Sequence, residues 1–205
     1  MKPINLFVAA AALIMSIGCG GCDPSKVNID DPVPVEEPSP ITWEDCSHDI
    51  GDHPCDFNLT DQNGDNWNLY DHYGSIIVLD FSTEWCYYCQ VAASEAQVLQ
   101  DAYIDQGIIY VTILVEDSVG VAADHELVKQ WADHFGIIAP VLAGSRDLLN
   151  STNPGGWVVE GWPTFYIIDR EMVLETSMRG YSSTSLMLIL DNMLVEEVEG
   201  TEESD

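Results

Sequence analysis

Two cysteines that are separated by two residues, Cys86 and Cys89, stand between a predicted strand and a predicted helix. The strand is the apolar run 76–79, and a continuous run of this length is typical of a strand that is buried on both faces. Residues 86–106 have a helical pattern, which ends at Gly107. A buried strand that leads into a helix indicates an α/β fold, and it places both cysteines in the first turn of that helix.

The position of this CxxC pair predicts thiol chemistry. The partial positive charge and the free N–H groups at a helix N-terminus stabilise a thiolate. Cys86 lies at the very start, so it is the predicted nucleophile, and Cys89 is the predicted resolving thiol. A zinc half-site has the same spacing, but zinc needs two further ligands, and residues 46–195 contain no second CxxC.

The segments on either side of this strand and helix predict a hairpin and a second strand–helix pair. Alternating apolar and polar residues around Asn63-Gly64 predict the hairpin, because this dipeptide is a strong turn former. Residues 108–115 have the composition of a second buried strand. Asp124 and Gly136 are the residue types expected at the start and at the end of a helix.

Two more strands and a final helix complete the predicted domain, over residues 163–168, over 172–178 and from a capping Ser183 onward. The order of elements is then hairpin, β, α, β, α, β, β, α. This order predicts an α/β fold with a mixed central sheet, helices on both faces and an N-terminal β-hairpin. We expect the domain to span residues 46–195.

The two ends of the chain have the composition of segments outside a core. Residues 1–18 contain one Lys, an apolar run and a closing Gly, which is a secretory signal pattern. Cys19 follows in a context that resembles the lipidation site of bacterial lipoproteins. We expect residues 19–45 to form a disordered, acidic, proline-rich tether and residues 196–205 to form a disordered acidic tail.

The formal net charge of −29, with six Lys and Arg against 35 Asp and Glu, excludes whole classes of partner. Such a chain does not neutralise phosphate, so nucleic acid is not an expected ligand. Anionic lipid headgroups repel it as well, so attachment to a membrane needs a hydrophobic or a lipid anchor. We therefore expect a domain that is tethered through Cys19 in a bacterial cell envelope and faces the periplasm or the outside.

Two segments of the predicted domain resemble the active-site segments of thioredoxins. Residues 78–89, Val-Leu-Asp-Phe-Ser-Thr-Glu-Trp-Cys-Tyr-Tyr-Cys, are similar to the segment with the redox cysteines. Residues 161–169, Gly-Trp-Pro-Thr-Phe-Tyr-Ile-Ile-Asp, are similar to the cis-proline segment. The likeness spans roughly residues 55–195, and with the export signal and the hairpin the chain most resembles the membrane-tethered TlpA/ResA-type thiol–disulfide oxidoreductases.

The resemblance implies a role for each matching residue. Cys86 matches the attacking cysteine, and Cys89 matches the resolving cysteine. Pro163 matches the cis-proline that lies against the disulfide, and the backbone of Trp162 would pair with a substrate chain as an added strand. Asp80 matches the buried carboxylate that helps to move the proton of the resolving cysteine; burial would raise its pKa.

Aromatic residues surround the two cysteines. Trp85 matches the tryptophan that flanks the site in thioredoxins. Tyr87 and Tyr88 replace the Gly-Pro of thioredoxin, and we expect them to shape a docking surface for a substrate. The glutamate that the TlpA/ResA branch often has six residues after the first cysteine is Ala92 here.

A second pair of cysteines, Cys46 and Cys55, precedes the thioredoxin-like body. In an exported protein the default is a structural disulfide. The alternative is a zinc or copper site, because His48 and His53 complete a Cys-x-His-x4-His-x-Cys arrangement.

The expected function is dithiol–disulfide exchange with cysteines of other exported proteins, with a membrane redox partner and no cofactor. Two alternatives stay open. One is a thiol peroxidase that uses Cys86, since Thr83 precedes it by three residues as in peroxiredoxins, although Leu79 replaces the proline of that family. The other is a non-catalytic metal-binding module.

Overall fold

The computed structural model describes residues 40–149 and 155–202, with side chains up to Val195. The predicted signal segment 1–18, the lipidation site Cys19 and nearly all of the tether lie outside the described residues, so these remain predictions. Among the described helices, none combines the length and the apolar composition needed to cross a bilayer.

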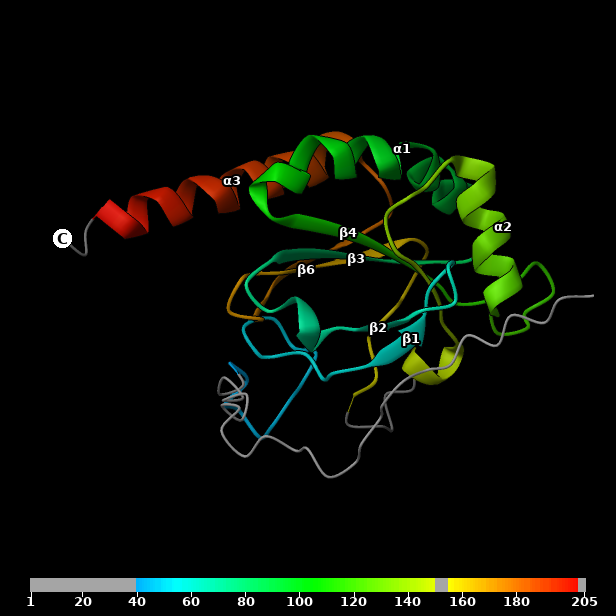
Figure 1. Cartoon of the computed structure of the whole chain (residues 1–205), viewed down its shortest axis with the longest axis horizontal. Coiled ribbons are helices and arrows are strands. Elements are labelled where there is room, and N and C mark those ends of the chain that lie inside the picture. Colours follow the sequence, from blue (N-terminus) through cyan, green and yellow to red (C-terminus); the bar gives the residue numbers. More distant parts are fainter. Residues whose placement is uncertain (1–39, 150–154, 203–205) are drawn as a thin grey trace, which may run out of the picture. The chain divides into compact units, whose positions relative to one another are not determined.

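A five-stranded mixed sheet forms the centre of the domain, with the strand order β5-β4-β3-β6-β7 (Figure 1). The strands are β3 (Ile76–Ser82), β4 (Ile108–Leu114), β5 (Val141–Ala143), β6 (Thr164–Ile168) and β7 (Leu174–Arg179). β3 pairs parallel with β4 and antiparallel with β6. Every residue of β3 is buried, which confirms a central strand covered on both faces.

The predicted hairpin is present as a separate two-stranded antiparallel sheet of β1 (Asn58–Thr60) and β2 (Asn66–Asn68). The Oδ1 atom of Asp61 accepts hydrogen bonds from the N–H groups of Asn63 at 2.8 Å and Asp65 at 2.9 Å. Gly64 has a φ of 87°, which a residue with a side chain rarely adopts. The turn therefore depends on this aspartate and this glycine.

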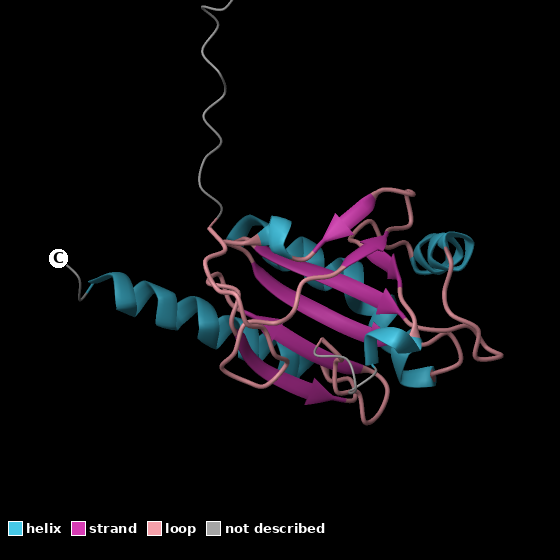
Figure 2. Cartoon of the chain, turned by 90° about the horizontal axis from the view of Figure 1, so that it is seen from below, coloured by secondary structure: helices cyan, strands magenta, loops and turns pink. Residues whose placement is uncertain are grey.

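Three α-helices pack beside the sheet within the described residues: α1 (Tyr87–Tyr103), α2 (His125–Phe135) and α3 (Ser183–Glu202). All three contribute side chains to the same buried cluster, on one face of the sheet. The cluster on the other face contains side chains of the hairpin, of the 3-10 helix η3 (Arg146–Leu149) and of the loop residue Trp157. Figure 2 presents the sheet from below. The three α-helices thus cover one face of the sheet. The hairpin, the 3-10 helix η3 and loops cover the other face, where a second layer of helices was expected.

The element boundaries agree with the predictions for α1 and α2 and differ for α3. Asp124 accepts a hydrogen bond from the N–H of Leu127 at 2.9 Å, and Gly136 ends α2 with a φ of 69°. Ser182 rather than Ser183 caps α3, since its Oγ atom accepts from the N–H of Ser185.

Two further details of the secondary structure differ from the expectation. The helix α3 is longer than the predicted domain, since it continues to Glu202; the disorder of the acidic tail stays a prediction. Glutamate has a high helix propensity, which explains why an acidic segment can extend an existing helix. The short strand β5 was not predicted, because three residues carry too little periodicity.

Candidate active site

Cys86 is the N-cap residue of α1, at the point where the chain leaves β3. Its backbone is extended, with φ −82° and ψ 116°, and its N–H donates to the carbonyl of Thr83 at 3.3 Å. Its Sγ atom accepts a hydrogen bond from the N–H of Cys89 at 3.2 Å. The sulfur therefore occupies the position of a helix-capping oxygen, where the helix dipole and a free N–H favour negative charge.

Cys89 lies one turn further along α1 and differs sharply from Cys86 in its surroundings. Both are free thiols, but Cys86 is 7% exposed and Cys89 is completely buried. Burial raises the pKa of Cys89 well above its usual value, and the charge of Asp80 and a hydrogen bond with Cys86 raise it further. The pair is thus asymmetric: a reagent from outside meets Cys86 first, and Cys89 stays protonated until a base acts on it.

Asp80 lies in the middle of β3 and has no solvent exposure. Its carboxylate accepts hydrogen bonds from Ser82 Oγ at 2.7 Å and from Tyr110 Oη at 2.9 Å. Burial raises the pKa of Asp80 from 3.8 to about 7, and the two hydrogen bonds oppose this rise. A carboxyl group with such a pKa can accept or donate a proton near neutral pH. Sequence reasoning missed Tyr110, because its contact with Asp80 comes from the neighbouring strand β4.

The aromatic residues around the cysteines form an exposed rim. Trp85 is 49%, Tyr87 71% and Tyr88 61% exposed. Trp162 meets Trp85 edge to face, with ring centroids 6.5 Å apart. The four aromatic residues that the sequence singled out therefore lie at or beside the CxxC segment.

The peptide bond between Trp162 and Pro163 is cis, as the resemblance implied. The carbonyl of Pro163 accepts a hydrogen bond from the N–H of Gly180 at 2.7 Å, which fixes the start of β6. Neither backbone polar group of Trp162 is hydrogen-bonded to another described residue. This leaves a short stretch of main chain with free hydrogen-bonding groups next to Trp85.

A carboxylate that sequence reasoning did not single out contacts this rim. The indole N–H of Trp85 donates to Glu116 Oε1 at 3.0 Å. Arg146 donates to the same carboxylate from Nε at 2.5 Å and from Nη2 at 2.6 Å. These hydrogen bonds from Arg146 hold the pKa of Glu116 below its usual value. The sequence signal was an acid directly behind a buried strand, which needs a partner.

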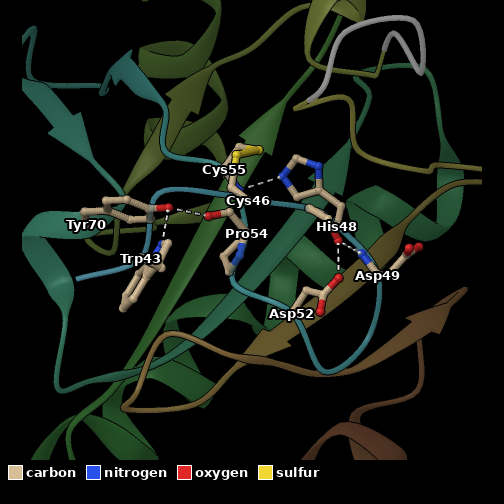
Figure 3. Close-up of a disulfide and its surroundings, with 9 residues drawn as sticks. Trp43, Cys46, His48, Asp49, Asp52, Pro54, Cys55 and Tyr70 are labelled. Atoms are coloured by element: carbon tan, nitrogen blue, oxygen red, sulfur yellow. Dashed lines mark hydrogen bonds between the residues drawn. A yellow bond between two sulfur atoms is a disulfide. The ribbon is translucent and has the colours of Figure 1, made fainter. Parts of the chain in front are cut away.

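Cys46 and Cys55 form the predicted disulfide (Figure 3), in the segment before β1. His48 Nε2 accepts from the N–H of Cys55 at 3.3 Å, and the His48 ring lies 3.9 Å from the ring of Trp157. The Nδ1 atom of His53 is hydrogen-bonded to the carbonyl oxygen of Met172 at 2.9 Å. The disulfide removes both thiolates from the alternative metal site, and among the described residues no group of three or more potential ligands could hold a metal ion.

Comparison with known proteins supports the fold. The chain is 31% identical over 122 residues to the thiol-disulfide oxidoreductase ResA of Geobacillus kaustophilus, an alignment that covers 59% of this chain and 64% of ResA. It therefore spans less than two thirds of the length of that curated relative.

Solved structures of the same fold include a thiol:disulfide interchange protein of the thioredoxin family from Chlorobium tepidum. The TM-score is 0.57 at 20% identity, covering 75% of this chain and 99% of that chain. The exposed lipoprotein thioredoxin Etrx1 of Streptococcus pneumoniae has a TM-score of 0.56 at 24% identity, covering 69% of this chain and 99% of that one. These similarities confirm the predicted thioredoxin-like fold and the resemblance to ResA. Because the AhpC/TSA family model also matches residues 50–177, well over half of the sequence, the chain belongs to the AhpC/TSA family.

Proposed function

We propose that the protein is a thiol–disulfide oxidoreductase that exchanges electrons with cysteines of other exported proteins through Cys86 and Cys89. The observation that carries this proposal is the asymmetry of the pair. Cys86 caps a helix with a partly accessible sulfur, whereas Cys89 is buried and protonated behind it. A nucleophile and a resolving thiol need these two environments.

In the reducing direction the reaction has two steps. The thiolate of Cys86 attacks one sulfur of a substrate disulfide, which forms a mixed disulfide and releases one substrate thiolate. Cys89 then loses its proton to Asp80 and attacks the Sγ atom of Cys86. This attack closes the Cys86–Cys89 disulfide, releases the second substrate thiolate and transfers two electrons to the substrate. The oxidising direction reverses both steps.

Asp80 is suited to the second step because its pKa of about 7 makes it a stronger base than an ordinary carboxylate, which narrows the gap to the raised pKa of Cys89. Ser82 and Tyr110 stabilise the carboxylate that accepts this proton. Burial disfavours the extra charge, so the proton transfer and the attack of Cys89 are expected to be coupled.

A substrate polypeptide would lie along Trp162 as an added strand, with Pro163 against the reacting sulfurs. The free backbone groups of Trp162 support this role, and the exposed rings of Trp85, Tyr87 and Tyr88 offer apolar contact area around it. Aromatic side chains bind with little loss of conformational entropy, which suits a docking surface for varied partners.

The location proposed for this activity is the cell envelope. ResA and the exposed lipoprotein thioredoxin are similar to this chain, and Cys19 stands behind a signal-like segment. Lipidation at Cys19 would hold the domain at a membrane, where a membrane redox partner could supply or remove electrons.

Two measurements test the proposed exchange. An equilibrium titration against glutathione gives the potential of the Cys86–Cys89 pair, and a value near about −270 mV favours a reductase, whereas one near about −120 mV favours an oxidase. The variant Cys89→Ala should accumulate mixed disulfides at Cys86 with its substrates. Absence of Cys86-dependent adducts would contradict the proposal.

One observation favours the second candidate, a thiol peroxidase. The hydroxyl of Thr83, three residues before Cys86, is buried and has no hydrogen-bond partner among the described residues, so it could bind a peroxide oxygen. Two results would favour this candidate over exchange with polypeptides. The wild-type protein would consume hydrogen peroxide steadily in the presence of a thiol reductant, and Cys89→Ala would accumulate Cys86 as a sulfenic acid.

A further inference from the structure

The indole of Trp85, beside the nucleophile, is held by an ion pair between the buried Glu116 and the partly exposed Arg146, which the exchange chemistry does not itself require. Trp85 immediately precedes the nucleophile, and its indole is about half exposed. An indole with so much free surface has several accessible rotamers unless a polar contact fixes it. The only hydrogen bond of its N–H group among the described residues goes to Glu116.

Glu116 is well placed to fix this indole. Its side chain is 4% exposed, so its carboxylate is rigid and needs partners in the interior. Its backbone carbonyl also accepts the N–H of Glu84 at 3.0 Å. The residue thus binds the segment before Cys86 twice, once through the main chain of Glu84 and once through the side chain of Trp85.

Arg146 completes the arrangement from η3. Its guanidinium donates two hydrogen bonds to Glu116, so one fork-shaped cation fixes both carboxylate oxygens. A buried carboxylate without this cation would be strongly destabilised or protonated. The side chain of Arg146 is 62% exposed, so the ion pair itself adds little to the stability of the fold. Arg146 influences the active site by fixing the carboxylate of Glu116.

We propose that Glu116 and Arg146 are positioning residues that hold the Trp85 indole in the orientation that receives a polypeptide substrate; this inference rests on the proposed exchange function. Trp85 faces the edge of Trp162, whose free main chain is the proposed pairing site for the substrate. A polypeptide that pairs with Trp162 must therefore pass the clamped indole. A small disulfide needs only to reach the sulfur of Cys86.

The test is a double-mutant cycle of Trp85→Phe and Arg146→Ala, with reduced full-length protein and two oxidants. We expect Arg146→Ala to raise the KM for insulin about three- to tenfold, as loss of one orienting hydrogen bond predicts, with kcat nearly unchanged. The rate with oxidised glutathione should stay the same. In the Trp85→Phe background, Arg146→Ala should have no further effect on the KM for insulin.

The matched control is Lys129→Ala, which removes an exposed ion pair with Asp133 on α2 and should change neither rate. An unchanged KM in Arg146→Ala, or effects of the two substitutions that simply add, would overturn the inference. If Arg146→Ala does not fold, Arg146→Lys is used instead, because lysine keeps the positive charge but cannot donate two parallel hydrogen bonds to Glu116. The inference then requires a smaller rise in the KM for insulin, and this rise must be absent in the Trp85→Phe background.

A spectroscopic readout separates this inference from the proposed function. The indole N–H resonance of Trp85, assigned by its loss in Trp85→Phe, should shift in Arg146→Ala and stay in place in Lys129→Ala. If the wild-type protein exchanges with neither insulin nor glutathione, the proposed function fails, and an indole resonance that also stays in place in Arg146→Ala rejects the clamp. If exchange occurs but the resonance does not move, only the clamp is rejected.

Discussion

The pairs Cys46–Cys55 and Cys86–Cys89 belong to one folded domain but are in opposite redox forms. The first pair is joined across nine residues in the irregular segment before β1, and both of its cysteines are partly buried. The second pair consists of two free thiols in one helical turn, one reachable from outside and one enclosed. The first pair lies at no helix terminus of the described chain, and its neighbouring acids, Asp45 and Asp56, are exposed, unlike Asp80.

This difference explains how one chain can hold a structural and a chemical cysteine pair. Joining Cys46 and Cys55 closes a loop and restricts the unfolded chain, which stabilises the fold whatever the charge state of either sulfur. The Cys86–Cys89 pair works only if one sulfur is ionised, the other is protonated, and a base controls the change between them. The helix start and the buried Asp80 provide these conditions.

The largest expected difference between the pairs is in activity. Cys86→Ser should lower the rate of disulfide exchange about a thousandfold or more, because the nucleophile is lost. The double variant Cys46→Ala/Cys55→Ala should keep the wild-type rate. Reduction of insulin by each protein measures both effects, and equal losses in the two variants would remove the distinction between a chemical and a structural pair.

The next largest effect concerns Asp80 and the pH dependence of stability. Burial raises the folded-state pKa of Asp80 from 3.8 to about 7, so its stabilising protonated form is fully present below pH 3.8 and is lost as the pH rises through 7. Asp80→Asn cannot ionise, so it should gain stability relative to wild type as the pH rises. The gain should approach about 4 kcal/mol at pH 8, at about 1.4 kcal/mol for each unit of pKa shift.

Urea denaturation of both proteins under reducing conditions at pH 4, 6 and 8 measures this gain. Asp101→Asn, on the exposed side of α1, is the matched control and should show no such trend. A free-energy difference between Asp80→Asn and wild type that does not change with pH would show that the pKa of Asp80 is the same in the folded and the unfolded protein, and Asp80 would then lack the raised pKa on which the proposed proton transfer from Cys89 depends.

A smaller effect distinguishes the pairs in stability rather than in activity. Cys46→Ala/Cys55→Ala should lower the free energy of unfolding by about 2–3 kcal/mol, as the closure of a short loop predicts. Cys86→Ser should change it much less, because the serine hydroxyl can cap α1 in place of the sulfur. Urea denaturation at pH 7 measures both values, and a larger loss in Cys86→Ser would contradict the structural role assigned to the first pair.

The sequence predicted those parts of the fold and site that depend on local patterns. The CxxC pair at the start of α1 and the hairpin turn at Asn63-Gly64 follow from residue type and neighbouring residues, whereas the cis bond before Pro163 was implied by the resemblance to thioredoxins. The contact between Trp85 and Glu116 joins residues 31 positions apart and leaves no periodic signal.

The same reasoning explains why the sequence does not assign the elements that cover each face of the sheet. The apolar runs of β3 and β4 predict that both faces of the sheet are covered, but they do not say by which element. One face is covered by helices and the other by the hairpin, η3 and Trp157, a choice that depends on packing between distant segments.

The smallest expected effect is a loss of stability in acid, opposite in direction to the effect of Asp80, and it comes from His48 beside the first pair. Burial lowers the pKa of His48 from 6.5 to about 4. The neutral ring packs against Trp157, and its Nε2 atom accepts a hydrogen bond from the N–H of Cys55. A proton on Nε2 would turn this acceptor into a donor and break the hydrogen bond. The stability that the neutral ring contributes is present above pH 6.5 and is lost as the pH falls toward 4.

His48→Phe keeps an aromatic ring beside Trp157 without a titrating group, so it should lose less stability than wild type between pH 6.5 and 4. Since His48 is partly exposed, solvent screening reduces the expected difference to about 1 kcal/mol. His134→Phe, at an exposed position on α2, is the control and should behave as wild type does. Equal acid sensitivity of His48→Phe and wild type would mean that the disulfide segment does not depend on a neutral His48. With the predicted result, lowering the pH toward 4 would destabilise the segment around the structural pair through His48, whereas raising the pH through 7 would destabilise the domain around the chemical pair through Asp80.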